Sequence, residues 1–126
     1  MKKMMISVIC ILISLVTYSQ LPQYVFSNEW ETKDQAKAEK LMNDWKNITL
    51  EMDENAPRTF LLTEMDGNTI YFSQAFESLS AYEDWQKHFD ENLRSKVRKK
   101  FREMNGENAF EGTNTELVMA HVFKMR

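Results

Sequence analysis

Hydrophobic and polar side chains alternate with two different periods along this chain, and these periods predict its strands and helices. Residues 23–31 alternate at period two between aromatic or β-branched and polar side chains, which predicts a first strand. One side of that strand would carry Tyr24, Phe26, Asn28 and Trp30. Residues 58–65 and 69–76 predict two further strands, joined by the hairpin signal Asp66-Gly67-Asn68. Residues 115–125 are apolar on both faces, which predicts a last strand in the centre of the sheet.

Apolar residues at intervals of three and four predict two helices between these strands. The first would start at a capping box, with Thr32 as N-cap and Gln35 reaching back, and end by about residue 53 because Pro57 disfavours helical geometry before it. The second would start at the capping box 80–83 and end at Asn105-Gly106. Its length of roughly 24 residues predicts one long helix that is straight, kinked or split.

The predicted order is strand, helix, strand, strand, helix, strand, which is typical of an α+β, ferredoxin-like βαββαβ sandwich. Helices cover one face of such a sheet, whereas the other face would still carry large apolar side chains. A monomer would leave that patch in water, and two sheets packed face to face would bury it. We therefore expect a homodimer.

Composition narrows the class of protein. The 126 residues hold 16 Lys+Arg against 19 Asp+Glu, a formal net charge of -3. This length allows one domain, and the slightly acidic balance argues against a nucleic-acid partner, which requires a basic surface.

The first residues predict export. Lys2 and Lys3 precede an uncharged apolar run that is shorter than the roughly 20 residues needed to cross a bilayer. Thr17 and Ser19 suit the positions before a signal-peptidase cut, so residues 1–19 are interpreted as a secretory signal peptide and residues 20–126 as the mature domain. The mature chain would be periplasmic or extracellular, with no stable membrane anchor. A retained anchor is the alternative.

Segment 76–89 carries a resemblance to a known family. An aromatic, an acidic and a small residue, Phe76-Glu77-Ser78, lead into a helix with Ala81, Tyr82 and His88. This run resembles the antibiotic-biosynthesis-monooxygenase-like (ABM) domains of the dimeric α/β-barrel superfamily. The resemblance implies a dimeric α/β barrel that binds a small apolar or aromatic molecule, with cofactor-independent monooxygenase-like activity.

Candidate site residues follow from side-chain chemistry. The catalytic candidates have polar tips that could donate to a substrate oxygen or move a proton: Asn28, Tyr71 and His121. The ligand-binding candidates are aromatic or lie beside aromatic residues on a helix: Trp30, Phe72, Trp85 and His88. Core packing or an exposed helix edge is the alternative interpretation for each of them.

No cofactor and no metal site are expected, because the two histidines lie on different elements and neither has a metal-binding spacing. Three alternatives to a catalytic domain stay open: a non-catalytic ligand carrier, a protein-interaction domain, and a haem-binding protein using His88 or His121. The basic segment 94–102 is interpreted as a solvated end of a helix, with an anionic partner such as a lipid surface or glycan as the alternative.

Overall fold

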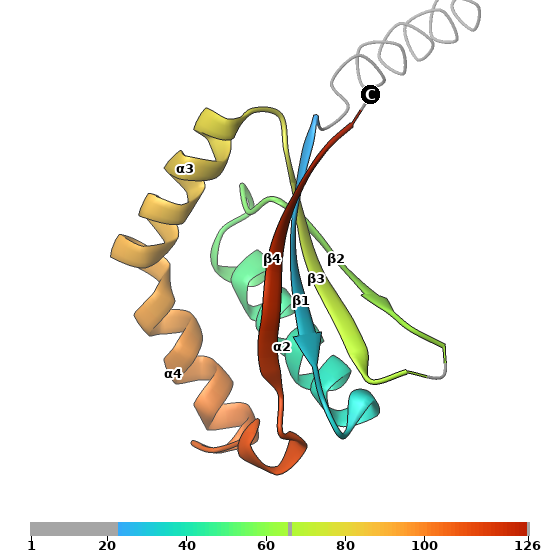
Figure 1. Cartoon of the computed structure of the whole chain (residues 1–126). Helices are drawn as coiled ribbons and strands as arrows, with labels where there is room; N and C mark the ends of the chain where they lie inside the picture. The colour runs from blue at the N-terminus through green and yellow to red at the C-terminus, as the bar shows by residue number, and fades with distance from the viewer. Residues whose placement is uncertain (1–22, 66, 126) are drawn as a thin grey trace, which may run out of the picture.

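The structure is a computed structural model that describes residues 23–65 and 67–125 (Figure 1). The predicted signal peptide, residues 1–19, lies outside the described residues. The elements, in chain order, are β1 (Tyr24–Glu31), α2 (Gln35–Met52), β2 (Arg58–Thr63), β3 (Thr69–Phe76), α3 (Leu79–His88), η1 (Phe89–Leu93), α4 (Arg94–Asn105), η2 (Glu111–Thr113) and β4 (Glu116–Lys124).

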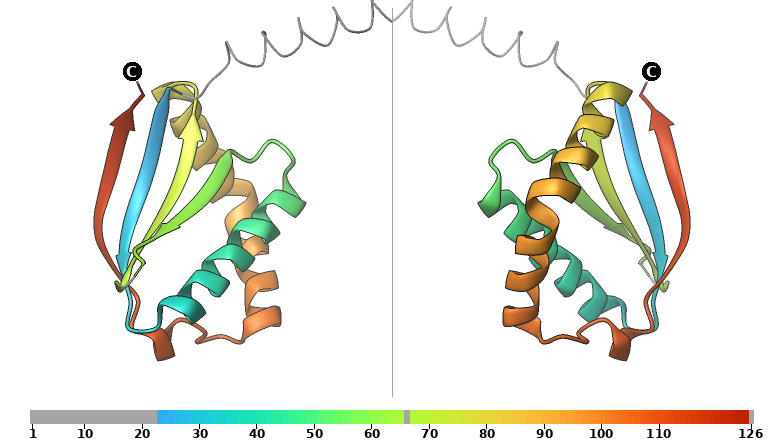
Figure 2. Two further views of the ribbon diagram at one scale, coloured as in Figure 1. Left: turned by 90° about the vertical axis from the view of Figure 1, so that its right-hand side faces the viewer. Right: turned by 90° about the vertical axis from the view of Figure 1, so that its left-hand side faces the viewer.

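The four strands form one antiparallel sheet in the order β2-β3-β1-β4. Together with the βαββαβ chain order, this is the arrangement of a split βαβ sandwich. Figure 2 shows the helices on one side of the sheet, and no other element of the described residues covers the opposite side. The prediction of an α+β fold is thus confirmed, whereas a dimeric barrel involves a second chain and stays a prediction.

The prediction that the last strand is central is wrong. β4 pairs with β1 and lies at the edge of the sheet. Its large apolar side chains are exposed: Leu117, Val118, Met119, Val122 and Phe123. An apolar pattern on both faces usually marks a strand buried from both sides, but here it marks an edge strand whose apolar side chains the described residues leave exposed.

Neither predicted capping box caps its helix. The N-cap of α2 is Asp34, whose carboxylate accepts from the Lys37 N–H. The hydroxyl of Thr32 is buried and donates instead to the carbonyl of Thr113, which ties the start of α2 to the turn before β4. The N-cap of α3 is Ser78, two residues earlier than expected, and its hydroxyl accepts from the Ala81 N–H.

The long second helix is continuous but contains a π-helical segment, η1. The buried or half-buried residues along it are spaced by four: Trp85, Phe89, Leu93, Val97 and Phe101. In a regular α-helix each step of four advances about 40° beyond a full turn, so four steps would move the apolar stripe through about 160°. The wider π turn compensates for this drift and keeps the stripe on the core side.

The core lies between the sheet and the helices. Leu41 and Ile48 of α2 pack with Trp85 of α3 and with Val97 and Phe101 of α4. α3 packs on β3, whereas α4 packs mainly on α2. Gly106 then ends α4 with a φ of 89°, a conformation that favours glycine.

Candidate functional site

A cavity of about 570 Å³ lies between the helix-covered face of the sheet and the helices. Its floor comes from β1, β2 and β3, one wall from α2, and the other wall from α3, η1 and α4. Pockets of about 300–1,000 Å³ with mostly apolar linings and a few polar groups are typical of small-molecule sites. This cavity is therefore the candidate site.

Aromatic side chains form much of the wall. They are Trp30, Trp45, Phe72, Trp85, Phe89 and Phe110. The chain has three tryptophans, and all of them line the cavity. The ring of Phe89 lies 6.3 Å from the ring of Trp45 and 5.9 Å from that of Trp85, centroid to centroid, so the aromatic groups of the two helical walls meet at η1.

Amide groups supply the polar part of the floor. Asn28 of β1 is paired with Phe72 of β3, and Gln74 follows two residues along the same strand face. Asn28 lies near the middle of its strand, yet its side chain is exposed because the cavity lies over it. Both carboxamides therefore offer hydrogen-bond donors and acceptors to a molecule in the cavity.

The charged groups that line the cavity are all cations: Lys46, Arg94 and Arg98. The π turn helps to place Arg94, because residues five apart lie one turn apart in such a segment. Its backbone N–H donates to the carbonyl of Phe89, and its guanidinium carbon lies 5.7 Å from the centre of the Phe89 ring. Among the described residues that line the cavity there is no carboxylate, imidazole, thiol or phenol.

The structure brings four of the predicted site residues together. Asn28, Trp30, Phe72 and Trp85 all line the cavity. Two strands and one helix contribute them, β1, β3 and α3. The antiparallel pairing of β1 with β3 places the first three side by side.

Tyr71 and His121 do not line the cavity, because strand alternation turns them to the open face of the sheet. There Tyr71 is opposite Glu29, and Glu29 is opposite Met119. The Nε2 atom of His121 lies 3.0 Å from a carboxylate oxygen of Glu29. His121 is therefore engaged with Glu29 rather than with the cavity, and Tyr71 lies on the same open face.

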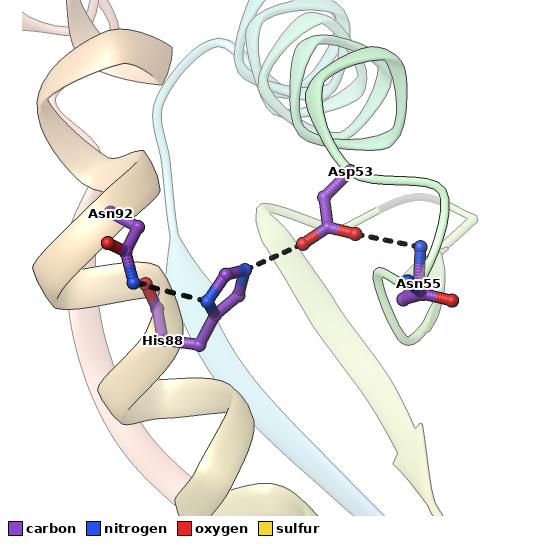
Figure 3. A network of polar contacts seen from close by, with 4 residues as sticks. All are labelled: Asp53, Asn55, His88 and Asn92. Atoms are coloured by element: carbon purple, nitrogen blue, oxygen red, sulfur yellow. Dashed lines mark hydrogen bonds and ion pairs between the residues drawn. The ribbon is translucent and has the colours of Figure 1, made fainter.

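His88 lies on α3 and faces the end of α2 (Figure 3). The Asn92 amide donates to Nδ1 over 3.2 Å, which places the ring proton on Nε2, and Nε2 donates to the Asp53 carboxylate over 2.7 Å. The Asn55 backbone N–H donates to the other carboxylate oxygen over 2.9 Å. This network ties the C-terminus of α2 to α3 beside the cavity.

The pKa of Asp53 is held below its usual range. The main cause is the hydrogen bond from the Asn55 N–H, followed by the one from His88, while partial burial acts in the opposite direction. Since neither histidine lines the cavity, the chain offers no imidazole there as an axial ligand to haem.

The sequence prediction missed several lining residues, among them Lys46, Gln74, Phe89, Arg94 and Arg98. Gln74 could have been found, because it shares a strand face with Phe72. Arg94 and Arg98 required the position of the π turn, which changes which side chains reach the core side; the intervals of four from Trp85 to Phe101 were the available signal.

The described residues were also searched for metal-binding clusters and for membrane-spanning helices. Within 23–65 and 67–125, no three His, Cys, Asp or Glu side chains gather in a way that could hold a metal ion. None of the helices in that part of the chain combines the length and apolar character needed to cross a membrane.

No family model and no curated protein matches the sequence. The structure is similar to the crystal structure of SnoaB, a cofactor-independent oxygenase from Streptomyces nogalater. The TM-score is 0.47 and the sequence identity 16%, over 83% of this chain and 94% of that chain. The function of this chain is therefore argued below from its own cavity.

Proposed function

We propose that this chain is a small-molecule-binding protein that takes an apolar or aromatic ligand into the cavity between its sheet and its helices. The cavity carries the proposal: about 570 Å³, aromatic walls that include all three tryptophans, and amides at the floor. Apolar walls stabilise a ligand by about 25 cal/mol for each Å² of apolar surface removed from water, and the few polar groups orient it.

Binding can be tested with two neutral probes, 2-naphthalenemethanol and decanol, measured by isothermal titration calorimetry on the purified chain. Native mass spectrometry of the same sample would detect a ligand that co-purifies. We expect at least one probe to bind or a ligand to co-purify. Absence of both, together with absence of binding by the carboxylate and the amine that carry the same naphthalene ring, would overturn the proposal.

A matched pair of variants places the binding in the cavity. Thr59→Phe puts a ring into the cavity floor on β2, and Thr63→Phe adds the same ring on the same strand at an exposed position outside the lining. We expect Thr59→Phe to weaken binding at least tenfold and Thr63→Phe to leave it unchanged. Equal effects of the two substitutions would place binding elsewhere.

A second candidate function is monooxygenase-like turnover of the bound molecule without a cofactor. Asn28 favours it, because its carboxamide is exposed to the cavity beside Trp30 and could donate to a substrate enolate oxygen. No carboxylate or imidazole lines the cavity, so the proton would have to leave a substrate that is itself acidic.

Oxygen consumption with 2-tetralone tests this candidate. In the reaction the acidic CH₂ group and O₂ would give a new carbonyl and water. Uptake above that of the ketone alone, with at least a tenfold loss in Asn28→Leu, would favour turnover. Uptake equal to the protein-free rate would leave the carrier role.

We also propose that two chains associate through the open face of the sheet, as the sequence predicted. The exposed apolar side chains Leu62, Met119 and Phe123 support this, because strand alternation and the pairing register place all three on that face. Sedimentation equilibrium at micromolar concentration should give a dimer, and a monomer would contradict the proposal.

Export stays a proposal supported by the sequence of residues 1–19 alone. N-terminal sequencing of the protein from outside the cytoplasm should find Gln20 as the first residue. An intact Met1 there would contradict cleavage.

A further inference from the structure

We infer that the cavity selects an organic acid: an apolar or aromatic molecule whose carboxylate is bound by Arg98, with Lys46 contributing. This inference rests on the proposed function and adds the charge of the ligand to it.

The distribution of charge around the cavity differs from that of the whole chain. Over the 126 residues acids outnumber bases, 19 to 16. Around the cavity the described lining includes Lys46, Arg94 and Arg98 and no Asp or Glu. A positive site within an acidic chain attracts anions and disfavours cations.

The three cations are not equally available. Arg94 forms an ion pair with Asp90, one turn earlier on the same helix, so its charge is partly neutralised. Lys46 and Arg98 form no ion pair within residues 23–65 and 67–125. A ligand carboxylate would therefore find its partners in these two side chains.

Position also favours Arg98 as the main partner. Lys46 comes from α2 and Arg98 from α4, two helices that pack against each other. Arg98 borders both the cavity and a shallow depression along the outer side of α4, which puts its side chain at the rim. A guanidinium can hold a carboxylate through two parallel hydrogen bonds, whereas an ammonium acts as a point charge.

The aromatic walls determine the chemical character of the part of the ligand that lies inside the cavity. Trp30 and Phe72 on the floor and Trp85 on the α3 wall would contact an apolar body. Apolar walls beside the two cations also lower the local dielectric constant, which strengthens the attraction for a carboxylate. The ligand class is thus an amphiphilic acid with its carboxylate at the rim and its apolar part inside.

The test uses three probes with the same aromatic body: 2-naphthoate, 2-naphthalenemethanol and 2-naphthylmethylamine, measured by calorimetry at pH 7 and low salt. We expect the acid to bind at least tenfold more tightly than the alcohol, and the amine to bind most weakly. Because charge-assisted hydrogen bonds are screened by salt at an exposed rim, the preference should shrink at higher ionic strength.

Substitutions test whether the preference for the acid over the alcohol depends on Arg98 in the cavity. Arg98→Gln should weaken binding of the acid about tenfold, the order expected for loss of a hydrogen bond to a charged group, and leave the alcohol unchanged. Arg98→Lys, which keeps the charge, should retain part of the preference. Lys96→Gln is the matched control, since it removes one charge from an exposed position of α4 outside the cavity lining.

The possible failures are distinguishable. If the acid and the alcohol bind equally, or if Lys96→Gln reduces the preference as much as Arg98→Gln does, selection of an acid is wrong and the binding function stands. If none of the naphthalene probes binds, decanol does not bind, and no ligand co-purifies, the proposed function itself fails.

Discussion

Both faces of the sheet carry aromatic and apolar side chains, but their surroundings differ. On the helix-covered face, Trp30 and Phe72 lie under α2, α3 and α4 and line a cavity. On the open face, Met119 and Phe123 lie on a surface that no element of the described chain covers. Aromatic content therefore does not define a site by itself. A site requires a second layer that leaves room above the sheet, and residues 23–65 and 67–125 provide no second layer on the open face.

The polar groups of the two faces differ in the same way. Asn28 and Gln74 on the covered face point into the cavity. On the open face, Ser27 and Ser73 are buried and hydrogen-bonded to each other over 2.8 Å, and His121 is engaged with Glu29. The covered face keeps Asn28 and Gln74 available to a ligand, whereas on the open face Ser27 is hydrogen-bonded to Ser73 and His121 to Glu29.

The largest expected difference between the two faces is in the free energy of unfolding that is lost when one apolar side chain of each face is shortened to alanine. Ile70→Ala removes a fully buried side chain on the covered face and should lower the free energy of unfolding by about 2–5 kcal/mol. Leu62→Ala, on the open face, should change it by less than about 0.5 kcal/mol in a monomer, because that side chain is largely exposed. Urea denaturation in a Phe123→Glu background, which keeps chains apart, measures both values. Similar losses would mean that the open face is covered after all.

A charge on the open face should separate the proposed dimer. Phe123→Glu puts a carboxylate into the apolar surface and should weaken self-association at least tenfold, because the charge would be buried without a partner. Val122→Glu is the matched control, because Val122 directly precedes Phe123 in β4 and is similarly exposed (58% against 52%) but faces the helix side. Sedimentation equilibrium measures both dissociation constants. An equal loss for both variants would show that the edge of β4, rather than the open face, holds the dimer.

The smallest expected effect concerns the network beside the cavity. Because the folded pKa of Asp53 lies below its ordinary value, its carboxylate adds stability at neutral pH. That increment is lost as the pH falls from about 4 through the lowered folded pKa. Asp53→Asn should therefore be less stable than the parent at pH 6 and lose less stability between about pH 5 and 3, as followed by urea midpoints.

The neighbouring exposed residue gives the control for this pH dependence. Glu54→Gln removes a carboxylate that takes part in no ion pair within the described residues. Its pH dependence should match that of the parent chain. A matching slope for Asp53→Asn as well would show that the network with His88 and Asn55 does not stabilise the fold.

Sequence patterns were sufficient to predict the order and type of the elements, but not which elements and residues contact one another. Period two and the intervals of three and four placed all four strands and both long helical segments. The first capping box was misplaced because the Thr32 hydroxyl donates to the carbonyl of Thr113, 81 residues away, which no local pattern contains. The second was misplaced because Ser78, two residues before the expected cap, caps α3. β4 was misplaced because a strand's position in the sheet depends on which strands pair, and its composition fitted both the centre and an uncovered edge.

For the candidate site, the strand residues were easier to predict than the helix residues. Asn28, Trp30 and Phe72 follow from alternation, which fixes the face once the strands are known. The spacing of four from Trp85 to Phe101 carried a signal for the π turn, because a regular α-helix could not keep those side chains on one side. Without that turn, neither Arg94 nor Arg98 would be expected at the cavity.

The sequence by itself determined the βαββαβ order, the alternation of each strand and the apolar stripe of each helix, because these depend on periodicities of a few residues. Only the tertiary structure decided where those surfaces meet. It put Tyr71 and His121 on the open face and Asn28 on the other, although all three had been grouped as one site. It also brought Lys46 and Arg98 to one cavity from helices about 50 residues apart, since α4 packs on α2 and leaves space above the sheet. Which partners are close in space depends on the packing of layers, and no local pattern encodes that distance.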